Sequence, residues 1–380
     1  MHWVGTWASS PQPVDKSSAP PEPGLANTTL RQVVRVSIGG KQIRVRLSNA
    51  FGNAPLTIAA AHVALPAGAA AIKAGSDQAL LFHGQPSVTI PAGALMVSDP
   101  LDFPIAALSD LAITIRLGDL PGGITTHSGS RETSYFQAGA AVSAPDMPNA
   151  AHTDHWYFVN GVDVVADDSA GAIVALGDSI TDGHGSTTNG NDRWTDDLAR
   201  RLQADKHTRD ISVLNQGIGG GRLLHDGLGP NALARLDRDV LAQTGVKWLI
   251  VFEGVNDIGT RSRASRRNEQ PASAEDIIGA YEQIIERAHA HKIRVYGATI
   301  TAFGGSFYDK PDTQEVWQKV NTWIRTSGKF DAVIDFDVTA RDPKDPSHLS
   351  PTVDSGDHLH PGVSGYQAIA GSIDLKLFRK

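Results

Sequence analysis

The chain has 380 residues, of which 41% are hydrophobic and 20% charged, and both values are ordinary for a globular protein. Its formal net charge of −7 excludes a general attraction to nucleic acid or anionic membranes, because those partners are negatively charged as well. The absence of cysteine excludes disulfides, thiolate metal sites and a cysteine nucleophile. The length exceeds what one hydrophobic core usually organises, so we expect two domains.

Neither a membrane span nor a targeting segment stands out in the sequence. No stretch approaches the roughly 18 consecutive apolar residues that cross a bilayer. The opening residues, MHWVGTWASS, lack the charged and apolar regions of a secretory signal peptide. We therefore expect no membrane span, and these features leave the compartment open.

The first half of the chain alternates polar and apolar residues in the way that β-strands do. Between Leu30 and Ser48, two alternating runs flank Gly39 and Gly40, which predicts a β-hairpin. Further strands are predicted in LTIAAAHVAL, PSVTIPAG, LAITIRLG and HWYFVNGVDVVA, which are separated by Gly, Pro and Asp. Helical periodicity is almost absent. The pattern predicts an all-β sandwich, jelly-roll-like, over residues 1–168.

The second half, residues 169–380, alternates apolar strands with amphipathic helices. The predicted strands are AIVALG, DISVLNQG, VKWLIVFEG, RVYGATIT and AVIDFDVT. Helical stretches begin near Trp194, Asn231, Ala274, Thr313 and Ser364. Five such units predict an α/β domain whose five-stranded parallel sheet is covered by helices on both faces.

The first of these strands ends in GDSITDG, which places Asp178 and Ser179 where open parallel sheets bind ligands. A serine becomes a nucleophile only if a base takes its proton. The segment DSGDHLHPGVSGY supplies a candidate, because Asp357 precedes His360 by three residues. This spacing lets the carboxylate hold one imidazole nitrogen while the other faces the serine. Asp178 itself is expected to hold the turn through backbone hydrogen bonds.

Hydrogen-bond donors for an oxyanion follow the second and third strands. NQGIGGG brings the N–H of Gly220 close to a substrate, with Gly219 or Gly221 as alternatives. GVND brings the side-chain amide of Asn256. Together with the N–H of Ser179 at a helix N-terminus, three donors can converge on one oxygen.

In this order, GDSITDG, NQGIGGG, GVND and DHLHP resemble the four sequence blocks of the SGNH or GDSL-type hydrolases. The resemblance runs from Ala172 to the C-terminus and implies a flavodoxin-like α/β/α fold. It implies Ser179 as nucleophile, His360 as base and Asp357 as its partner. It further implies an oxyanion hole formed by Ser179, Gly220 and Asn256.

The all-β half resembles the N-terminal domains of two-domain bacterial members of the same group, which are often exported esterases. THSGSRETSYFQAG is similar to a segment of such members, but no role follows for it. This resemblance implies a secreted or periplasmic protein whose signal peptide has been removed.

Two other kinds of site are weaker interpretations of the same segments. His358 and His360 form an H-x-H pair, and Asp354 or Asp357 could complete a metal site. The serine and asparagine blocks would have no role in such a site, so we expect no metal and no cofactor. GIGGGR matches a dinucleotide-binding motif only partly, because Arg222 replaces its final glycine.

An arginine-rich segment and three tryptophans can each be interpreted in two ways. The segment after Asn256 contains four arginines, Arg261, Arg263, Arg266 and Arg267, and is expected to be a solvated loop, with a substrate lid as the alternative. Three tryptophans of the β half could stack on sugars, but core packing is the commoner role: Trp3, Trp7 and Trp156.

We therefore predict a metal-independent serine esterase that cleaves short acyl groups, above all acetate, from a small-molecule or carbohydrate ester. Polar residues follow both Ser179 and Asn256, and such flanks favour short acyl groups over long ones. The alternatives are a lysophospholipase or lipolytic esterase with the same triad, and a non-catalytic carbohydrate-binding protein. No nucleic-acid partner is expected, and the sequence leaves the oligomeric state open.

Overall fold

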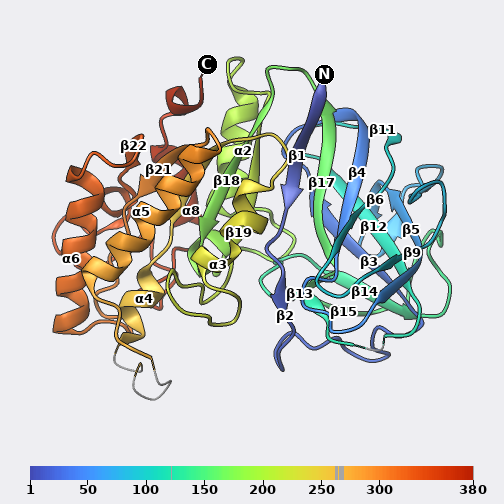
Figure 1. Cartoon of the computed structure of the whole chain (residues 1–380), viewed down its shortest axis with the longest axis horizontal. Coiled ribbons are helices and arrows are strands. Elements are labelled where there is room, and N and C mark those ends of the chain that lie inside the picture. The colour runs from blue at the N-terminus through green and yellow to red at the C-terminus, as the bar shows by residue number, and fades with distance from the viewer. Residues whose placement is uncertain (121, 262–263, 265–268, 380) are drawn as a thin grey trace. The chain divides into compact units, whose positions relative to one another are not determined.

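The computed structural model describes residues 1–120, 122–261, 264 and 269–379. The chain divides into two compact units, which Figure 1 colours from blue to green and from green to red along the chain. The first unit comprises Met1–Ser169 together with Thr188–Asn191, and the second comprises Ala170–Thr187 and Asp192–Lys380.

The first unit is built from antiparallel strands. One sheet has the order β1-β17-β4-β10, with β11 also paired to β4. Its strands are β1 (His2–Ala8), β17 (Val159–Ala166), β4 (Gly40–Ser48), β10 (Leu95–Val97) and β11 (Leu101–Ile105). The antiparallel all-β organisation predicted for this half is confirmed, while the jelly-roll assignment stays a prediction.

A second sheet has the order β15-β14-β3-β12-β5-β8, with β9 also paired to β5. Its strands are β15 (Ala151–Thr153), β14 (Ser134–Ala138), β3 (Thr28–Arg35), β12 (Asp110–Leu117), β5 (Leu56–Ala64), β8 (Gln78–Ala79) and β9 (Val88–Ile90). Shorter strands complete the unit: β2 (Gln12–Pro13), β13 (Thr125–His127), β16 (Trp156–Tyr157), β6 (Pro66–Gly68) and β7 (Ala71–Ile72).

The predicted hairpin around Gly39 and Gly40 is wrong. β3 pairs with β12 and β14, whereas β4 pairs with β17, β10 and β11, so the two strands lie in different sheets. A two-residue type I′ turn needs positive φ at both central residues, and neither glycine has it. Gly39 is needed for a close approach instead, because a Cβ there would lie 2.4 Å from the carbonyl oxygen of Ile105. Alternation alone does not distinguish a hairpin from a chain that crosses between sheets.

The tryptophans of the first unit serve its packing. Trp7 and Trp156 are buried and meet edge to face, with ring centroids 4.9 Å apart. The guanidinium of Arg44 lies 4.6 Å from the centre of the Trp3 ring. Packing is therefore the role that the structure gives to Trp7 and Trp156, as expected from the usual fate of tryptophan.

The second unit contains a five-stranded parallel sheet of order β19-β18-β20-β21-β22. Its strands are β18 (Gly171–Gly177), β19 (Ile211–Gly217), β20 (Val246–Phe252), β21 (Arg294–Ala298) and β22 (Ala332–Ile334). Its helices are α1 (Ser179–Asp182), α2 (Trp194–Ala204), α3 (Ala232–Leu236), η1 (Asp237–Leu241), α4 (Val255–Gly259), α5 (Ala274–Ala290), α6 (Pro311–Thr326), α7 (Phe336–Ala340), α8 (Val363–Ser372) and η3 (Leu375–Phe378).

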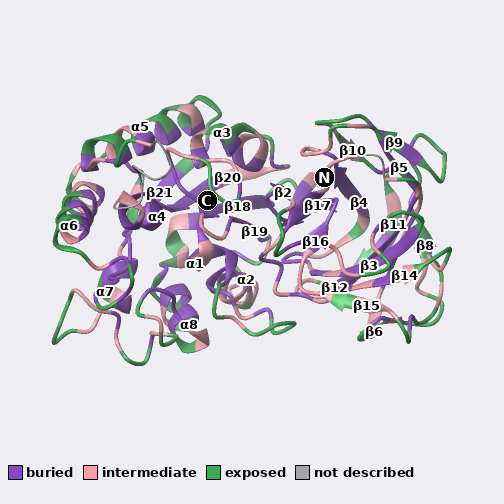
Figure 2. Cartoon of the chain, turned by 90° about the horizontal axis from the view of Figure 1, so that it is seen from below, coloured by how far each residue is buried: buried purple, intermediate pink, exposed green. Residues whose placement is uncertain are grey.

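Helices cover both faces of this sheet. Figure 2 shows the buried strands in a row, with α3 and α5 on one side and α2, α7 and α8 on the other. All seven residues of β18 are buried, as expected for a strand covered on two faces. The five predicted strands and the α/β fold are confirmed. The last predicted strand is too long, because the Asp335 side chain accepts the N–H of Val338 and starts α7.

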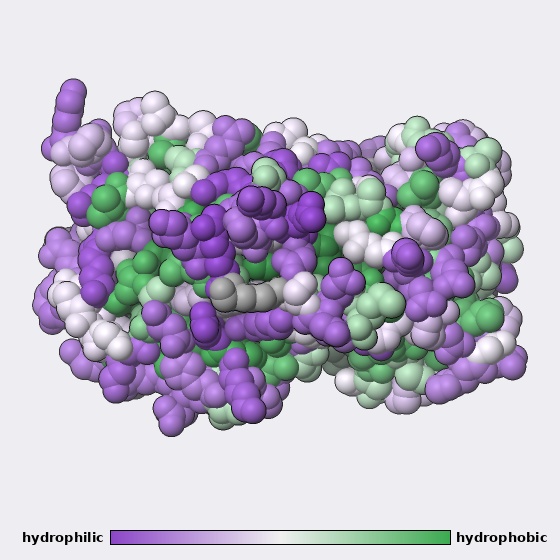
Figure 3. Space-filling view, turned by 90° about the horizontal axis from the view of Figure 1, so that it is seen from above, coloured by the Kyte–Doolittle hydropathy of each residue, from purple (hydrophilic) through white to green (hydrophobic). Residues whose placement is uncertain are grey.

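The surface is mixed in polarity. Figure 3 shows hydrophilic side chains interspersed with smaller apolar areas on the face that it presents. Among the helices of the described ranges, none is both long and apolar enough to cross a membrane.

Candidate active site

The turn after β18 presents Ser179 at the first position of α1. The carboxylate of Asp178 accepts the N–H of Ile180 at 2.9 Å and thereby caps the helix. Gly177 permits the tight turn, since a Cβ there would lie 2.2 Å from Thr181 Oγ1. The structural role predicted for Asp178 follows from these contacts.

The hydroxyl of Ser179 and the imidazole of His360 lie within hydrogen-bond distance, although 181 positions separate them in the sequence. Ser179 Oγ is 2.8 Å from His360 Nε2. His360 Nδ1 is in turn 2.6 Å from Asp357 Oδ2. The structure therefore brings together the serine, histidine and aspartate that the sequence predicted, with the imidazole between the hydroxyl and the carboxylate.

The environment of Asp357 fixes the orientation of the imidazole. Burial acts to raise the pKa of Asp357, but hydrogen bonds donated by the His360 N–H and ring and by the Leu359 N–H outweigh it, and the pKa falls to about 2. An ionised carboxylate only accepts hydrogen bonds, so Nδ1 of His360 carries the proton. Nε2 is then left to accept the proton of Ser179.

The three adjacent N–H groups in the glycine turn after β19 differ in their hydrogen bonds. The Gly219 N–H donates to Asp182 Oδ2 at 2.8 Å, and the Gly221 N–H donates to the carbonyl of Ile218 at 2.8 Å. Gly220, between them, has a φ of +69°, which favours glycine. Because the neighbouring N–H groups are already engaged, these contacts favour Gly220 over the two alternatives as an oxyanion donor.

The side-chain amide of Asn256, at the start of α4, is held from both ends. Its Nδ2 donates to the carbonyl of Gly221 at 2.9 Å, and its Oδ1 accepts the hydroxyl of Tyr308 at 2.8 Å. The carbonyl of Gly221 can only accept, which settles the orientation of the amide. One Nδ2 hydrogen remains beyond the bond to Gly221, and Tyr308 is a positioning residue that the sequence did not reveal.

Three buried acidic side chains lie at the ends of β18 and β20. Burial is the largest cause that raises the pKa of Asp178 to about 7 and that of Asp257 to about 6. Burial likewise raises the pKa of Glu253 well above its usual value. Asp257 accepts the N–H groups of Leu223 and Leu224 at 2.8 and 3.1 Å, so it organises the loop after the glycine turn.

A fully buried arginine of α3 ties together the strand ends that carry these groups. Arg235 donates to the carbonyls of Gln216 and Gly177 at 2.6 and 3.0 Å. Its guanidinium also lies 3.3 Å from Asp239 Oδ2 and 3.4 Å from Glu253 Oε2. The arginine therefore fixes the last residues of β18 and β19 immediately before Ser179 and the glycine turn.

Comparison with protein families assigns the second unit of the chain to a family. The model of the GDSL-like lipase/acylhydrolase family matches residues 175–368, about half of the chain, and the match includes every predicted site residue. The chain belongs to this family. It is thus a GDSL-family acylhydrolase, with a second, antiparallel β-rich unit.

Solved structures similar to this GDSL protein have low sequence identity to it. A lipase/acylhydrolase from Enterococcus faecalis has 22% identity and a TM-score of 0.43, and the similarity covers 55% of this chain and 97% of that one. A catalytic mutant of an acetylxylan esterase from Geobacillus stearothermophilus has 18% identity and a TM-score of 0.43, covering 55% of this chain and 94% of that one. A search among curated proteins found no match.

The side chains of the H-x-H pair, His358 and His360, make separate contacts in the structure. The ring of His358 bonds Asp354 Oδ2 at 2.7 Å, whereas His360 faces Ser179 and Asp357. Within the described residues, the donor groups close enough to hold a metal are instead His184, Asp357 and His360. His184 lies in a polar stretch after the serine motif, and no pattern in the sequence singles it out.

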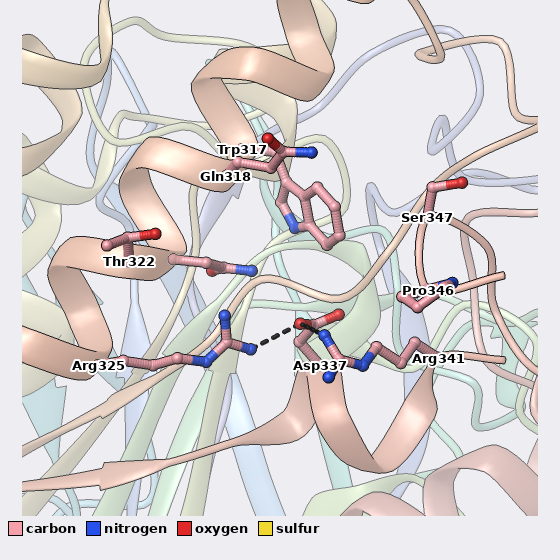
Figure 4. Close-up of a pocket in the computed structure, with 9 residues that line it drawn as sticks. Trp317, Gln318, Thr322, Arg325, Asp337, Arg341, Pro346 and Ser347 are labelled. Atoms are coloured by element: carbon pink, nitrogen blue, oxygen red, sulfur yellow. Dashed lines mark hydrogen bonds and ion pairs between the residues drawn. The ribbon is translucent and has the colours of Figure 1, made fainter. Parts of the chain in front are cut away.

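A separate cavity of about 310 Å³ lies between α6 and the segment around α7, and none of its lining residues is a predicted site residue. Figure 4 shows Arg325 and Arg341 converging on Asp337, which their nitrogens approach to 2.6 and 3.3 Å. Both arginines donate to Asp337 Oδ2, so the three side chains form one ion-pair cluster. Of the predicted arginine-rich loop, Arg263, Arg266 and Arg267 lie outside the described residues, so its role as a loop or lid stays a prediction.

Proposed function

We propose that this GDSL protein is a metal-independent serine esterase that hydrolyses short acyl esters, above all acetates, through an acyl-enzyme. The observation that carries the proposal is the continuous contact from Ser179 Oγ to His360 Nε2, at 2.8 Å, and from His360 Nδ1 to Asp357 Oδ2, at 2.6 Å. A serine paired with an imidazole that a carboxylate holds in place has what nucleophilic attack on an ester requires.

Acylation follows from these contacts. Ser179 Oγ attacks the ester carbonyl carbon while its proton passes to His360 Nε2, and the carbonyl oxygen becomes an oxyanion. The imidazolium is stabilised by the ionised Asp357, which keeps its own proton count unchanged. When the bond to the alcohol oxygen breaks, His360 returns the proton to the leaving alcohol, and Ser179 retains the acyl group.

The oxyanion is stabilised by the N–H groups of Ser179 and Gly220 and the remaining Nδ2 hydrogen of Asn256. Donors that are already fixed need no reorganisation when charge develops, which is why such groups lower the barrier effectively. Water then repeats the sequence: it gives a proton to His360, attacks the acyl carbon, and releases the carboxylic acid as Ser179 recovers its proton.

The nucleophile is tested by Ser179→Ala, assayed with an aryl acetate. We expect kcat to fall by at least about 10³-fold, because removal of a triad member leaves only the contribution of binding and the oxyanion donors. Circular dichroism and the unfolding midpoint should match those of the wild type. A fluorophosphonate should label the wild-type protein at Ser179 alone, and activity should persist in the presence of a chelator.

His360→Ala provides the second arm, since it removes the base while leaving the serine in place. Its activity should fall by a similar factor. Substantial turnover by Ser179→Ala, or labelling of another residue, would overturn the proposal, and loss of activity on chelation would overturn metal independence.

A further inference from the structure

A second imidazole lies against the predicted base, and the proposed reaction does not use it. The rings of His184 and His360 have centroids 4.0 Å apart. His184 Nε2 is also 4.0 Å from Asp357 Oδ2. The side chains of His184 and Asp357 are 49% and 37% exposed, so solutes can reach both from solvent.

The backbone holds His184 at this place. Its N–H donates to the carbonyl of Ser179 at 2.9 Å, and its own carbonyl accepts the hydroxyl of Tyr366 at 2.6 Å. The next residue, Gly185, allows close contact with the base segment, because a Cβ there would lie 2.8 Å from the carbonyl oxygen of Pro361. The two segments are thus packed together, and this packing keeps the half-exposed imidazole of His184 beside the base.

We propose that His184, Asp357 and His360 form an inhibitory binding site for Zn²⁺. Each offers one donor atom, and the three atoms lie within 4.8 Å of one another. Imidazole nitrogen and carboxylate oxygen are ligands that zinc prefers, with bonds of about 2.0–2.2 Å. Two such donors on a tetrahedral ion stand about 3.4 Å apart. His184 Nε2 and Asp357 Oδ2 are 4.0 Å apart, so binding requires these side chains to move closer together. Ionised Asp357 supplies negative charge, and solvent can complete the coordination.

Occupancy of this site and catalysis exclude each other, which is where the inference rests on the proposed function. Both ring nitrogens of His360 are already in use, Nε2 facing Ser179 and Nδ1 facing Asp357. A bound ion needs the lone pair of one of them. If it takes Nε2, the base is blocked; if it takes Nδ1, the proton there goes to solvent and the contact with Asp357 is lost.

The neighbouring His358 provides a matched control. It belongs to the same segment as His360, and its ring also contacts a carboxylate, at 2.7 Å from Asp354 Oδ2. It is not part of the donor cluster found among the described residues. His184→Asn and His358→Asn remove the same imidazole chemistry from the two positions, and asparagine tolerates the positive φ of 62° at position 358.

The experiment measures Zn²⁺ binding and inhibition on the full chain. Calorimetry with ZnCl₂ should detect one site in the wild type, and zinc should inhibit aryl acetate hydrolysis in a way that a chelator reverses. His184→Asn should need at least roughly tenfold more Zn²⁺ for half-inhibition, relative to its own zinc-free rate, because a ligand is lost. His358→Asn should match the wild type in zinc sensitivity.

The inference is overturned if the wild type binds no zinc by calorimetry, or if His184→Asn keeps wild-type zinc affinity and inhibition. Greater loss in His358→Asn than in His184→Asn would assign the ion to the other pair. Calorimetry does not depend on turnover, so a failure of the esterase assay alone would count against the proposed function and leave the zinc site standing.

Discussion

At the scale of single residues, Asp178 links the stability of the fold to pH. Its carboxyl is fully buried and precedes Ser179, the proposed nucleophile, and burial raises its pKa from 3.8 to about 7. Between these two values the folded state binds more protons than the unfolded state. The contribution of Asp178 to the free energy of unfolding therefore declines as pH rises from about 4 to 7 and stays low above it.

We predict that Asp178→Asn is more stable than the wild type above neutral pH, by up to about 4 kcal/mol, and that the difference vanishes near pH 4. Asparagine still accepts the N–H of Ile180 but carries no cost of ionisation. Urea denaturation at about pH 4, 6 and 8 measures the difference. Asp374→Asn makes the same change at an exposed cap and is the control. A difference that is constant across pH would contradict this account.

Tyr308 contacts Asn256, one of the proposed oxyanion donors. Its hydroxyl donates to Asn256 Oδ1 at 2.8 Å, and its ring packs over Gly259 of α4, where a Cβ would lie 2.1 Å from Tyr308 Cγ. Tyr308→Phe keeps the ring and removes only the hydroxyl. The amide can then rotate out of alignment with the oxyanion.

We predict that kcat of Tyr308→Phe falls by about tenfold while KM changes little, because the oxyanion exists only in the transition state. This loss is smaller than the roughly 10²-fold or more expected when a donor itself is removed, as in Asn256→Ala. Steady-state kinetics on an aryl acetate separates the two parameters. An increase in KM at constant kcat would show that Tyr308 serves substrate binding instead.

At the scale of elements, Arg235 joins α3 to the carboxyl ends of β18 and β19. The side chain is completely buried and donates to two strand-end carbonyls. Replacement by methionine keeps much of the length but removes a hydrogen-bond donor from those carbonyls and a buried cation from Asp239 and Glu253. We predict that Arg235→Met lowers the free energy of unfolding by about 3–5 kcal/mol.

The neighbouring Arg238 offers the control for this variant. It also bonds Asp239, at 2.6 Å, but its side chain is 30% exposed. Arg238→Met should therefore cost less than Arg235→Met, as partly solvated ion pairs contribute less. Equal losses in the two variants, measured by denaturant unfolding, would refute the role given to Arg235 at the strand ends.

Prediction from sequence succeeded where one element has a strong local pattern. The apolar run before Asp178 and the helical stretch from Ala274 each match an observed element, β18 and α5. The hairpin at Gly39 failed because alternation specifies a half-buried strand and not its partner. The partners of β3 and β4 are strands distant in the sequence, here β12 and β17. The sequence of such strands does not indicate which sheet they join.

The candidate site was predictable to the extent that its residues stand in motifs at strand ends. Asp182 was visible inside GDSITDG, but only the structure reveals its bond to Gly219. Tyr308 and Arg235 lie outside every motif, and their roles depend on contacts made across 52 and 58 positions of sequence. Such contacts follow from packing and are therefore hidden in a single sequence.

At the scale of the whole molecule, the two units are not simply the first and second parts of the sequence, because one short segment of the second part belongs to the first unit. Thr188–Asn191, which follows α1 in the sequence, groups with the β-rich unit. Asn189 Oδ1 accepts the N–H of Thr133, and Asn191 Nδ2 donates to buried Glu132 at 2.5 Å. The SRET segment, for which the sequence suggested no role, thus holds this short stretch.

The polarity of the site's surroundings bears on the acyl group that the chain accepts. The residues after α1 are mainly polar and exposed. Two large apolar side chains are exposed beside the predicted oxyanion donors. Leu228 is 51% exposed and would lie 3.5 Å from a Cβ on Gly220, and Phe307 is 56% exposed and contacts the ring of Tyr308. Leu228 therefore lies where it can limit the space beside the Gly220 N–H.

This arrangement predicts that kcat/KM for p-nitrophenyl esters is highest for acetate and declines toward octanoate. Burial of each additional CH₂ would contribute about 0.8 kcal/mol if an apolar pocket received it. We expect steric conflict with Leu228 to oppose the longer chain and to outweigh that gain. The series from acetate through butyrate to octanoate measures the trend directly.

Leu228→Ala tests the cause of the trend. Truncation makes room beside Gly220, so the ratio of kcat/KM for butyrate to that for acetate should rise by about tenfold, within the 1–3 kcal/mol that a misfitting methylene costs. Leu81→Ala makes the same change at an exposed leucine of the β-rich unit and should leave the ratio unaltered. A wild-type preference for octanoate, or efficient hydrolysis of lysophospholipid, would replace the short-acyl assignment with a lipolytic one, because only an extended apolar surface rewards each added methylene.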